Sequence, residues 1–243
     1  MTAELRQIWQ EAFGDSEEAL DRFAVTGFSS DRCHYICEED SPVSALYWFD
    51  CALNGQKLAY IYAVATLKSH RGQGLAQRLM AETHEILKQQ GYAGAILVPG
   101  EQGLFAFYEK IGYQTVTCIH SFLCQAGSEP VALREIGTEE YARLRREYLP
   151  AGGVIQEGAA LEWLHSYTTF YAGEDFLFSA AREGSHLLVQ EFLGNSALAG
   201  GILSALGMET GRFRTPGTEL DFAMYFPFTD TCPVPGYFGL ALD

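Results

Sequence analysis

The stretch Ser69-His-Arg71-Gly72-Gln73-Gly74-Leu75-Ala76 decides the fold, because it joins two segments of different character. The segment before it, residues 58–66, is apolar on both faces, as a central strand covered by helices should be. The segment after it, residues 74–89, has apolar side chains at helical spacing and charged ones between them. A loop from such a strand to such a helix presents consecutive backbone N–H groups, which suits a pyrophosphate.

The composition of this loop narrows the class of phosphate site. Gly72 and Gly74 allow the backbone to approach a ligand without a Cβ clash. The loop lacks the Gly-Lys-Ser/Thr ending of an NTPase P-loop, and Gln77 stands where the dinucleotide pattern Gly-x-Gly-x-x-Gly needs glycine. Instead, Arg71, Gly74 and Ala76 satisfy the pattern Arg/Gln-x-x-Gly-x-Gly/Ala.

The surrounding segments predict an α/β protein of the α+β kind, with a mixed twisted sheet flanked by helices. Residues 93–98 read as a second buried strand, so residues 58–98 form a βαβ unit with a right-handed crossover. Asp15 is expected to cap the second helix. The other predicted elements are helices at 5–13, from 16 to about 23 or beyond, and at 104–111, and strands at 33–37, 43–51 and 114–122.

A linker-like composition at Gln125-Ala-Gly-Ser-Glu-Pro130 predicts two domains, residues 1–126 and 127–243. The second half repeats the order of the first more weakly, which favours a smaller α/β domain. Its predicted elements are helices at 138–148 and 196–206, and strands at 131–135, 176–181, 187–192, 221–226 and 237–242.

Two motifs in order resemble the GNAT superfamily of N-acetyltransferases. Residues 71–76 are similar to its acyl-CoA pyrophosphate loop, and Phe107-Tyr-Glu-Lys-Ile-Gly-Tyr113 is similar to its Phe-Tyr-x-x-x-Gly-Phe segment. The resemblance covers most of residues 1–123 and implies a GNAT fold with acetyl-CoA as cosubstrate. The second half resembles a degenerate GNAT-like unit of the tandem type, because residues 193–201 lack the loop pattern and no second Phe-Tyr segment follows.

The resemblance also implies roles for individual residues. Tyr108 is the expected general acid on the departing thiolate, and the end of the central strand is expected to bond pantetheine and the thioester carbonyl through its backbone. A tyrosine hydroxyl with a pKa of about 10 is protonated at neutral pH, and a thiolate with a pKa of about 8.5 can accept its proton. The implied cosubstrate-binding residues are Val64, Ala65, Thr66, Arg71, Gly72, Gln73, Gly74, Leu75, Ala76 and Gln77.

The general base stays open at this point. Glu38, Glu39, Glu101 and His120 are the side-chain candidates, and the C-terminal carboxylate of Asp243 is a hypothesis for reaching the acceptor cleft. The second half is expected to pack on the first and to build an acidic wall of that cleft.

Charge and cysteine content restrict the partners. The 243 residues carry 16 Lys and Arg against 31 Asp and Glu, a net charge of −15, without a basic cluster. Nucleic acid and anionic membranes are therefore disfavoured, whereas cationic small molecules suit this charge. The six cysteines form no C-x-x-C pair, so no metal site is predicted and reduced cysteines in a cytoplasmic protein are expected. No apolar run reaches the roughly 18 residues that span a bilayer.

These observations favour an N-acetyltransferase that moves an acetyl group from acetyl-CoA to a primary amine of a cationic small molecule. The amine attacks directly in a ternary complex, so no cysteine nucleophile is needed. Two alternatives stay open, namely a non-catalytic acyl-CoA-binding sensor and an interaction module without a ligand. The acceptor, the acyl chain length and the oligomeric state are not determined by the sequence.

Overall fold

A computed structural model describes residues 1–242. The first half of the chain contains two N-terminal helices, a hairpin of long strands, and the βαβ unit predicted around the glycine-rich loop. Its elements are α1 Ala3–Phe13, α2 Glu17–Thr26, β1 Cys33–Glu38, β2 Ser41–Leu53, β3 Gln56–Thr66, α3 Leu75–Gln89, β4 Gly94–Leu97, α4 Gly103–Lys110 and β5 Gln114–Gln125.

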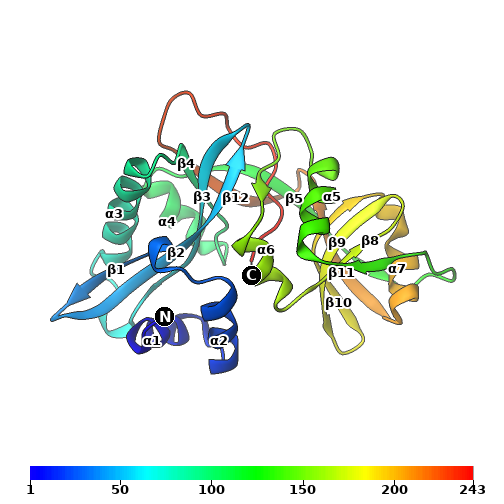
Figure 1. Ribbon diagram of the computed structural model, residues 1–243, viewed down its shortest axis with the longest axis horizontal. Coiled ribbons are helices and arrows are strands. Elements are labelled where there is room, and N and C mark those ends of the chain that lie inside the picture. Colours follow the sequence, from blue (N-terminus) through cyan, green and yellow to red (C-terminus); the bar gives the residue numbers. More distant parts are fainter. Residues whose placement is uncertain (243) are drawn as a thin grey trace.

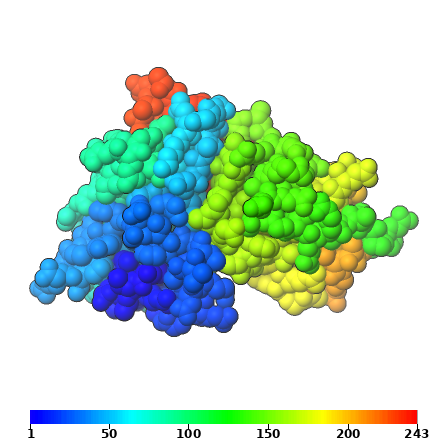
Figure 2. Space-filling model, in the orientation of Figure 1, coloured from blue at the N-terminus to red at the C-terminus, as the bar shows by residue number. Residues whose placement is uncertain are grey.

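The second half contains shorter elements. They are β6 Arg134–Ile136, α5 Thr138–Tyr148, β7 Ile155–Gln156, α6 Ala159–His165, β8 Thr169–Ala172, β9 Phe176–Glu183, β10 His186–Gly194, α7 Ala199–Leu206, β11 Thr210–Pro216 and β12 Leu220–Pro227. In Figure 2 the blue, cyan and blue-green part of the chain lies beside the green to orange part, and the red segment near the C-terminus lies at the top, next to the cyan atoms of the first half.

Within residues 1–242 the twelve strands form one sheet. Its order is β1-β2-β3-β4-β12-β5-β11-β10-β9-β8-β6, with β7 on the free part of β2. Strand β12 therefore lies between β4 and β5, antiparallel to both, although 100 or so residues separate it from them in the sequence (Figure 1). The division at residues 126 and 127 stays a prediction, and β12 shows that the two halves share their sheet.

Helix α3 packs on one face of the N-terminal part of the sheet, where Leu79, Met80 and Leu87 join a buried cluster with strand residues such as Trp48. Helices α1 and α2 cover the other face, through Trp9 and other side chains. This layering explains why β3 is apolar on both faces, as its sequence predicted.

A buried ion pair joins the elements of the second half. Arg145 of α5 donates from Nε and Nη2 to the Glu191 carboxylate of β10, at 2.6 and 3.0 Å, and both side chains are almost fully buried. Arg145 Nη1 also donates to the Val154 carbonyl at 3.1 Å, and the Tyr237 hydroxyl donates to Glu191 at 3.1 Å. Because every charge has partners, the pair can be buried without a net penalty from unsatisfied groups.

The C-terminal segment was predicted as a strand at residues 237–242, and this prediction is wrong. The segment is buried, but side chains satisfy its backbone: Gln156 Nε2 donates to the Leu240 carbonyl at 2.8 Å, and the Leu242 amide donates to the Tyr60 hydroxyl at 3.2 Å. Tyr237 forms only an isolated bridge, with Gly153. A short apolar run indicates burial, and its pattern predicts a strand although the segment 238–242 pairs with no neighbouring strand.

Candidate active site

The candidate site lies where the pairing between β3 and β4 ends. Strands β3 and β4 are parallel and paired over only three positions, ending at Tyr60 and Ile96. On the other side of β3, the register with β2 shifts and leaves one extra residue in β3. Ala63 lies in this bulge with φ +51°, a left-handed conformation that costs a non-glycine residue about 1–2 kcal/mol. Backbone strain of this kind is concentrated at functional sites.

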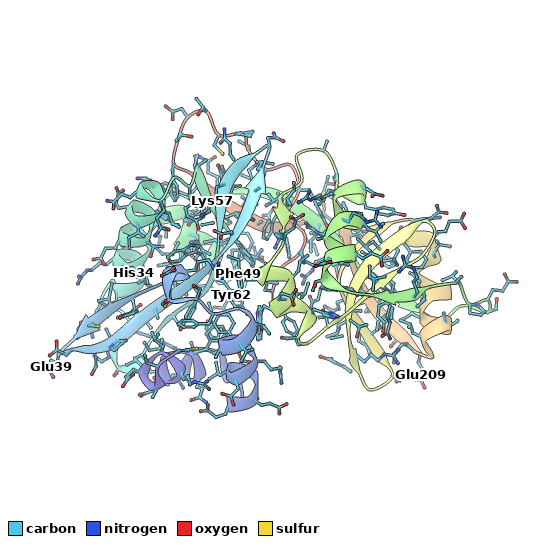
Figure 3. The ribbon with its side chains drawn as sticks, viewed as in Figure 1. His34, Glu39, Phe49, Lys57, Tyr62 and Glu209 are labelled. Atoms are coloured by element: carbon cyan, nitrogen blue, oxygen red, sulfur yellow. The ribbon has the colours of Figure 1, made fainter. Side chains whose placement is uncertain are left out.

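A cavity of about 810 Å³ opens at this point of the sheet. Its wall combines α1, the end of β3, the β4–α4 connection, β11, β12 and the C-terminal segment, so both halves of the chain build it. Val64 and Tyr108 line it. Tyr62, which also lines it, lies near the centre of the molecule beside Phe49, with ring centroids 5.6 Å apart (Figure 3).

A second cavity of about 240 Å³ lies at the glycine-rich loop, lined by loop and helix residues together with Thr66 and Phe107. Gly72 and Gly74 both have φ +78°, and a Cβ added to either would meet no heavy atom within 4 Å. The left-handed backbone, and not crowding by the protein, is therefore what requires glycine at these positions. The space beside them is open to a ligand.

The amide groups of this second cavity suit a diphosphate. Helix α3 begins after Gly74 without a side-chain cap, and the Arg78 amide donates the hydrogen bond of its first turn to the Gly74 carbonyl at 3.0 Å. The amides of Leu75, Ala76 and Gln77 thus have no partner in the preceding turn, and the dipole of this 15-residue helix favours an anion there. The residues present fit the diphosphate of acetyl-CoA.

The Arg71 side chain is held at the mouth of the same cavity. Its Nε donates to the Thr66 carbonyl at 3.1 Å, and the residue lines the cavity. Gln73 is the one predicted loop residue that is not part of this wall.

The two cavities adjoin, because residues that are close together in one strand or helix line the larger cavity in one case and the smaller cavity in the other. On β3, Val64 borders the larger cavity and Thr66 the smaller; on α4, Tyr108 borders the larger and Phe107 the smaller. A molecule with a diphosphate at one end and a reactive carbonyl at the other can therefore lie across both.

Backbone alternation distinguishes the three β3 residues. The Leu67 amide donates to the Val43 carbonyl at 2.9 Å, and the register pairs Ala65 with Ala45. Since hydrogen-bonded and non-hydrogen-bonded pairs alternate along antiparallel strands, the peptide groups of Ala65 face β2 and those of Val64 and Thr66 face the open side. Ala65 lines neither cavity, and its role in cosubstrate binding stays a prediction.

Tyr108 is 7% exposed, and burial raises the pKa of its hydroxyl to about 12. The group is therefore protonated at neutral pH and can act as a proton donor at the cavity wall.

The candidate bases are scattered. Glu101 lines the larger cavity. Glu38 lies 3.5 Å from the imidazole of His70, Glu39 has φ +48° in the turn before β2, and His120 lies 3.5 Å from Glu219. Asp243 lies outside the described residues.

Two carboxylates of the larger cavity were not predicted. Asp15 and Asp221 line it, together with the guanidinium of Arg212. Asp15 was expected to cap α2, but Ser16 does so by accepting from the Ala19 amide, while Asp15 accepts from Trp9 Nε1 at 2.6 Å. Asp221 had no sequence signal, because β12 reaches the site only through the strand order.

The corresponding junction in the second half is closed. Between β10 and α7, a Cβ on Gly194 would lie 2.2 Å from the Asp175 carbonyl, and Asn195 caps the turn that follows by accepting from the Ala197 amide. The space that is open beside Gly72 is here filled by protein.

Comparison with known proteins agrees with this geometry. Residues 2–116 match the model of a family described as acetyltransferase (GNAT) domain. The chain is 32% identical to N-acetyltransferase 8 of Rattus norvegicus over 63 residues and to that of Mus musculus over 62 residues. These matches cover 25% of this chain and 28% and 27% of the relatives, so the chain spans less than a third of their length.

Solved structures match over most of the chain. A GCN5-related N-acetyltransferase from Kribbella flavida has a TM-score of 0.68 at 19% identity, covering 91% of this chain and 67% of that one. A tandem GNAT protein from the clavulanic acid biosynthesis pathway has a TM-score of 0.54 at 8% identity, covering 94% and 95%. At these identities the similarity concerns the fold.

Residues 2–116 thus match an acetyltransferase (GNAT) domain, and the fold over most of the chain is similar to that of GCN5-related N-acetyltransferases. The resemblance and the mixed α/β fold predicted from the sequence are thus confirmed. Among residues 1–242, no helix has the length and apolar character needed to cross a membrane.

Proposed function

We propose that this protein transfers the acetyl group of acetyl-CoA to the primary amine of a cationic small molecule in a ternary complex. The observation that carries the proposal is the pair of adjoining cavities, one lined by a glycine-rich loop with uncapped helix amides and the other by Val64 and Tyr108.

The reaction needs three groups from the protein. The neutral amine attacks the thioester carbonyl, and a hydrogen bond from the Val64 amide stabilises the oxygen as it becomes negative. As the C–N bond forms and the C–S bond breaks, Tyr108 gives its hydroxyl proton to the departing thiolate. The amine loses one proton to a base, for which Glu101 is the side-chain candidate in the cavity wall.

The charge of the cavity supports a cationic acceptor. The residues that line the cavity include three with a carboxylate, Asp15, Glu101 and Asp221, and one with a guanidinium, Arg212. Residues 212 and 221 belong to the second half, which thus contributes a wall of the acceptor site. The closed junction at Gly194 supports a single cosubstrate site in the N-terminal domain. The proposal includes a cytoplasmic location, in keeping with the unpaired state of all six cysteines in residues 1–242.

Thiol release from acetyl-CoA tests the proposal. The purified protein is incubated with acetyl-CoA and, in turn, with polyamines, aminoglycosides, monoamines, amino acids and a peptide with a free N-terminus. Release above the rate without acceptor, together with acetylated amine in the mass spectrum, supports transfer. Acetyl-CoA binding without turnover on any amine would favour an acyl-CoA sensor, and an unchanged melting temperature with acetyl-CoA would favour an interaction module.

A further inference from the structure

The larger cavity, called the acceptor cavity from here on, is lined mainly by apolar side chains in addition to its carboxylates. Aromatic side chains from four different parts of the chain line it, among them Trp9 and Phe13 of α1, Phe105 of α4 and Phe222 of β12. Aliphatic side chains fill most of the remaining wall. Such surfaces bind apolar ligand bodies and leave few positions for polar recognition.

The mouth of this cavity exposes apolar side chains that a soluble surface has no need of. Phe13 is 48% exposed and Leu220 is 49% exposed, and both line the cavity. They lie on α1 and at the start of β12, so two segments far apart in the sequence bring exposed apolar side chains to the same cavity. Apolar surface gathered at an opening marks a place where a ligand is bound.

The charges of the cavity limit the charge of that ligand. One of the three carboxylates, Asp15, already accepts a 2.6 Å hydrogen bond from Trp9 Nε1, and Arg212 contributes an opposing positive charge. A polyamine or an aminoglycoside carries several ammonium groups, each of which must keep water or find a carboxylate when it is buried. Among residues 1–242 the wall has three carboxylates against one guanidinium, a net charge of −2, which is smaller than the positive charge of spermidine or of an aminoglycoside.

From these observations, and on the basis of the proposed function, we infer that the acceptor is a monoamine with an aromatic or similarly apolar ring. The ammonium group lies toward the carboxylates of the cavity and loses a proton before attack, and the ring lies between Phe13, Phe105 and Leu220. Aromatic pairs contribute about 0.5–1.5 kcal/mol beyond the burial of their surface, so the ring adds appreciably to binding.

Matched acceptors test this inference. Thiol release from acetyl-CoA is measured with phenethylamine and tryptamine, with ethylamine and spermidine, and with an aminoglycoside. We expect kcat/KM for the two ring-bearing monoamines to exceed that for ethylamine and for spermidine by at least about tenfold, which corresponds to 1.4 kcal/mol. Preference for spermidine or the aminoglycoside would overturn the inference and leave the proposed transferase function intact. Turnover of none of the amines would overturn both.

Two exposed side chains provide variants that keep the fold. Phe13→Ala and Leu220→Ala are expected to raise KM for phenethylamine about fivefold while leaving KM for ethylamine and for acetyl-CoA unchanged. Val25→Ala and Leu123→Ala are the controls, because these residues are 85% and 70% exposed and line neither cavity. Equal effects of Phe13→Ala on both amines would contradict a ring-binding role.

Discussion

Trp163 and Tyr62 form a hydrogen bond between the two halves of the chain, in which Nε1 of the indole donates to the phenol oxygen at 3.2 Å. Trp163 lies on α6 and Tyr62 on β3, one residue before the strained Ala63, and Tyr62 lines the acceptor cavity. The second half therefore holds in position a side chain of the first half that lines the larger cavity, which we propose as the acceptor site.

Trp163→Phe is expected to raise KM for the acceptor amine about fivefold and to leave KM for acetyl-CoA unchanged. In the unmodified protein the ring centroids of Trp163 and Phe23 lie 5.1 Å apart, and phenylalanine keeps a ring at this position. The variant loses only the hydrogen bond to Tyr62, which is worth about 1 kcal/mol. Trp48→Phe is the matched control, because Trp48 Nε1 also donates to a tyrosine hydroxyl, that of Tyr92 at 3.0 Å. Neither Trp48 nor Tyr92 lines a cavity. It should lower the melting temperature without changing either KM in steady-state kinetics.

Tyr108→Phe is expected to lower kcat about 100-fold with little change in the Kd of acetyl-CoA, because the ring stays and only the proton donor is lost. Thiol-release assays measure kcat, and calorimetric titration measures the Kd of acetyl-CoA. Tyr113→Phe is the control, because the Tyr113 ring lies 5.8 Å from the Tyr108 ring and lines neither cavity. This variant removes a buried hydroxyl group that forms a hydrogen bond with the His84 imidazole. An equal loss of kcat in Tyr113→Phe would mean that packing, and not proton donation, explains the result.

Gly74→Ala is expected to raise the Kd of acetyl-CoA about tenfold, since alanine resists the φ of +78° and its Cβ enters the space left for the ligand. Gly91→Ala carries the same backbone penalty, at φ +80° with open space around it, but at the other end of α3. Both variants should lose about 1 kcal/mol of unfolding free energy in urea titrations. If Gly91→Ala weakened acetyl-CoA binding as much, the loop would have no special role.

Glu191→Gln is expected to destabilise the protein by about 3 kcal/mol, because it leaves the buried Arg145 guanidinium without its counter-charge. Glu147→Gln breaks the exposed pair with Arg143, 2.9 Å long, and should change stability by less than about 0.5 kcal/mol. Chemical denaturation with circular dichroism compares the two. Similar midpoints for both variants would show that the buried pair has little effect on stability.

His84 is expected to make the protein less stable in mild acid. Burial lowers the pKa of this imidazole from 6.5 to about 4, so the unfolded chain binds more protons than the folded one between those two values. Stability therefore falls as the pH drops from about 6.5 to about 4, by roughly 3 kcal/mol, and falls no further from this group below that range. The change of melting temperature across this pH range should disappear in His84→Gln but not in the control His34→Gln, whose ring is 22% exposed and lies 3.1 Å from Glu82.

The first half of the chain was predictable because its local sequence signals agree with its tertiary structure. The strand that is apolar on both faces and the loop at residues 71–76 both appear where the sequence places them. The end of α2 at Thr26 agrees with the prediction, whereas its cap is Ser16 instead of Asp15.

The second half and the acceptor wall were less predictable because they depend on contacts between distant segments. Strand β11, residues 210–216, alternates small, charged and aromatic residues and gave no apolar run, while α6 and β8 are too short for a clear period. Arg212 and Asp221 reach the acceptor cavity only because β11 and β12 flank β5 in the sheet. No local pattern encodes that order.

The position of β12 has a consequence for biosynthesis. A ribosome must translate nearly all of this chain before residues 220–227 can enter the gap between β4 and β5. Until then the nascent N-terminal domain exposes two unpaired strand edges, which are templates for aggregation and natural binding sites for chaperones. Truncation upstream of β12 should consequently yield inclusion bodies and not a smaller active enzyme.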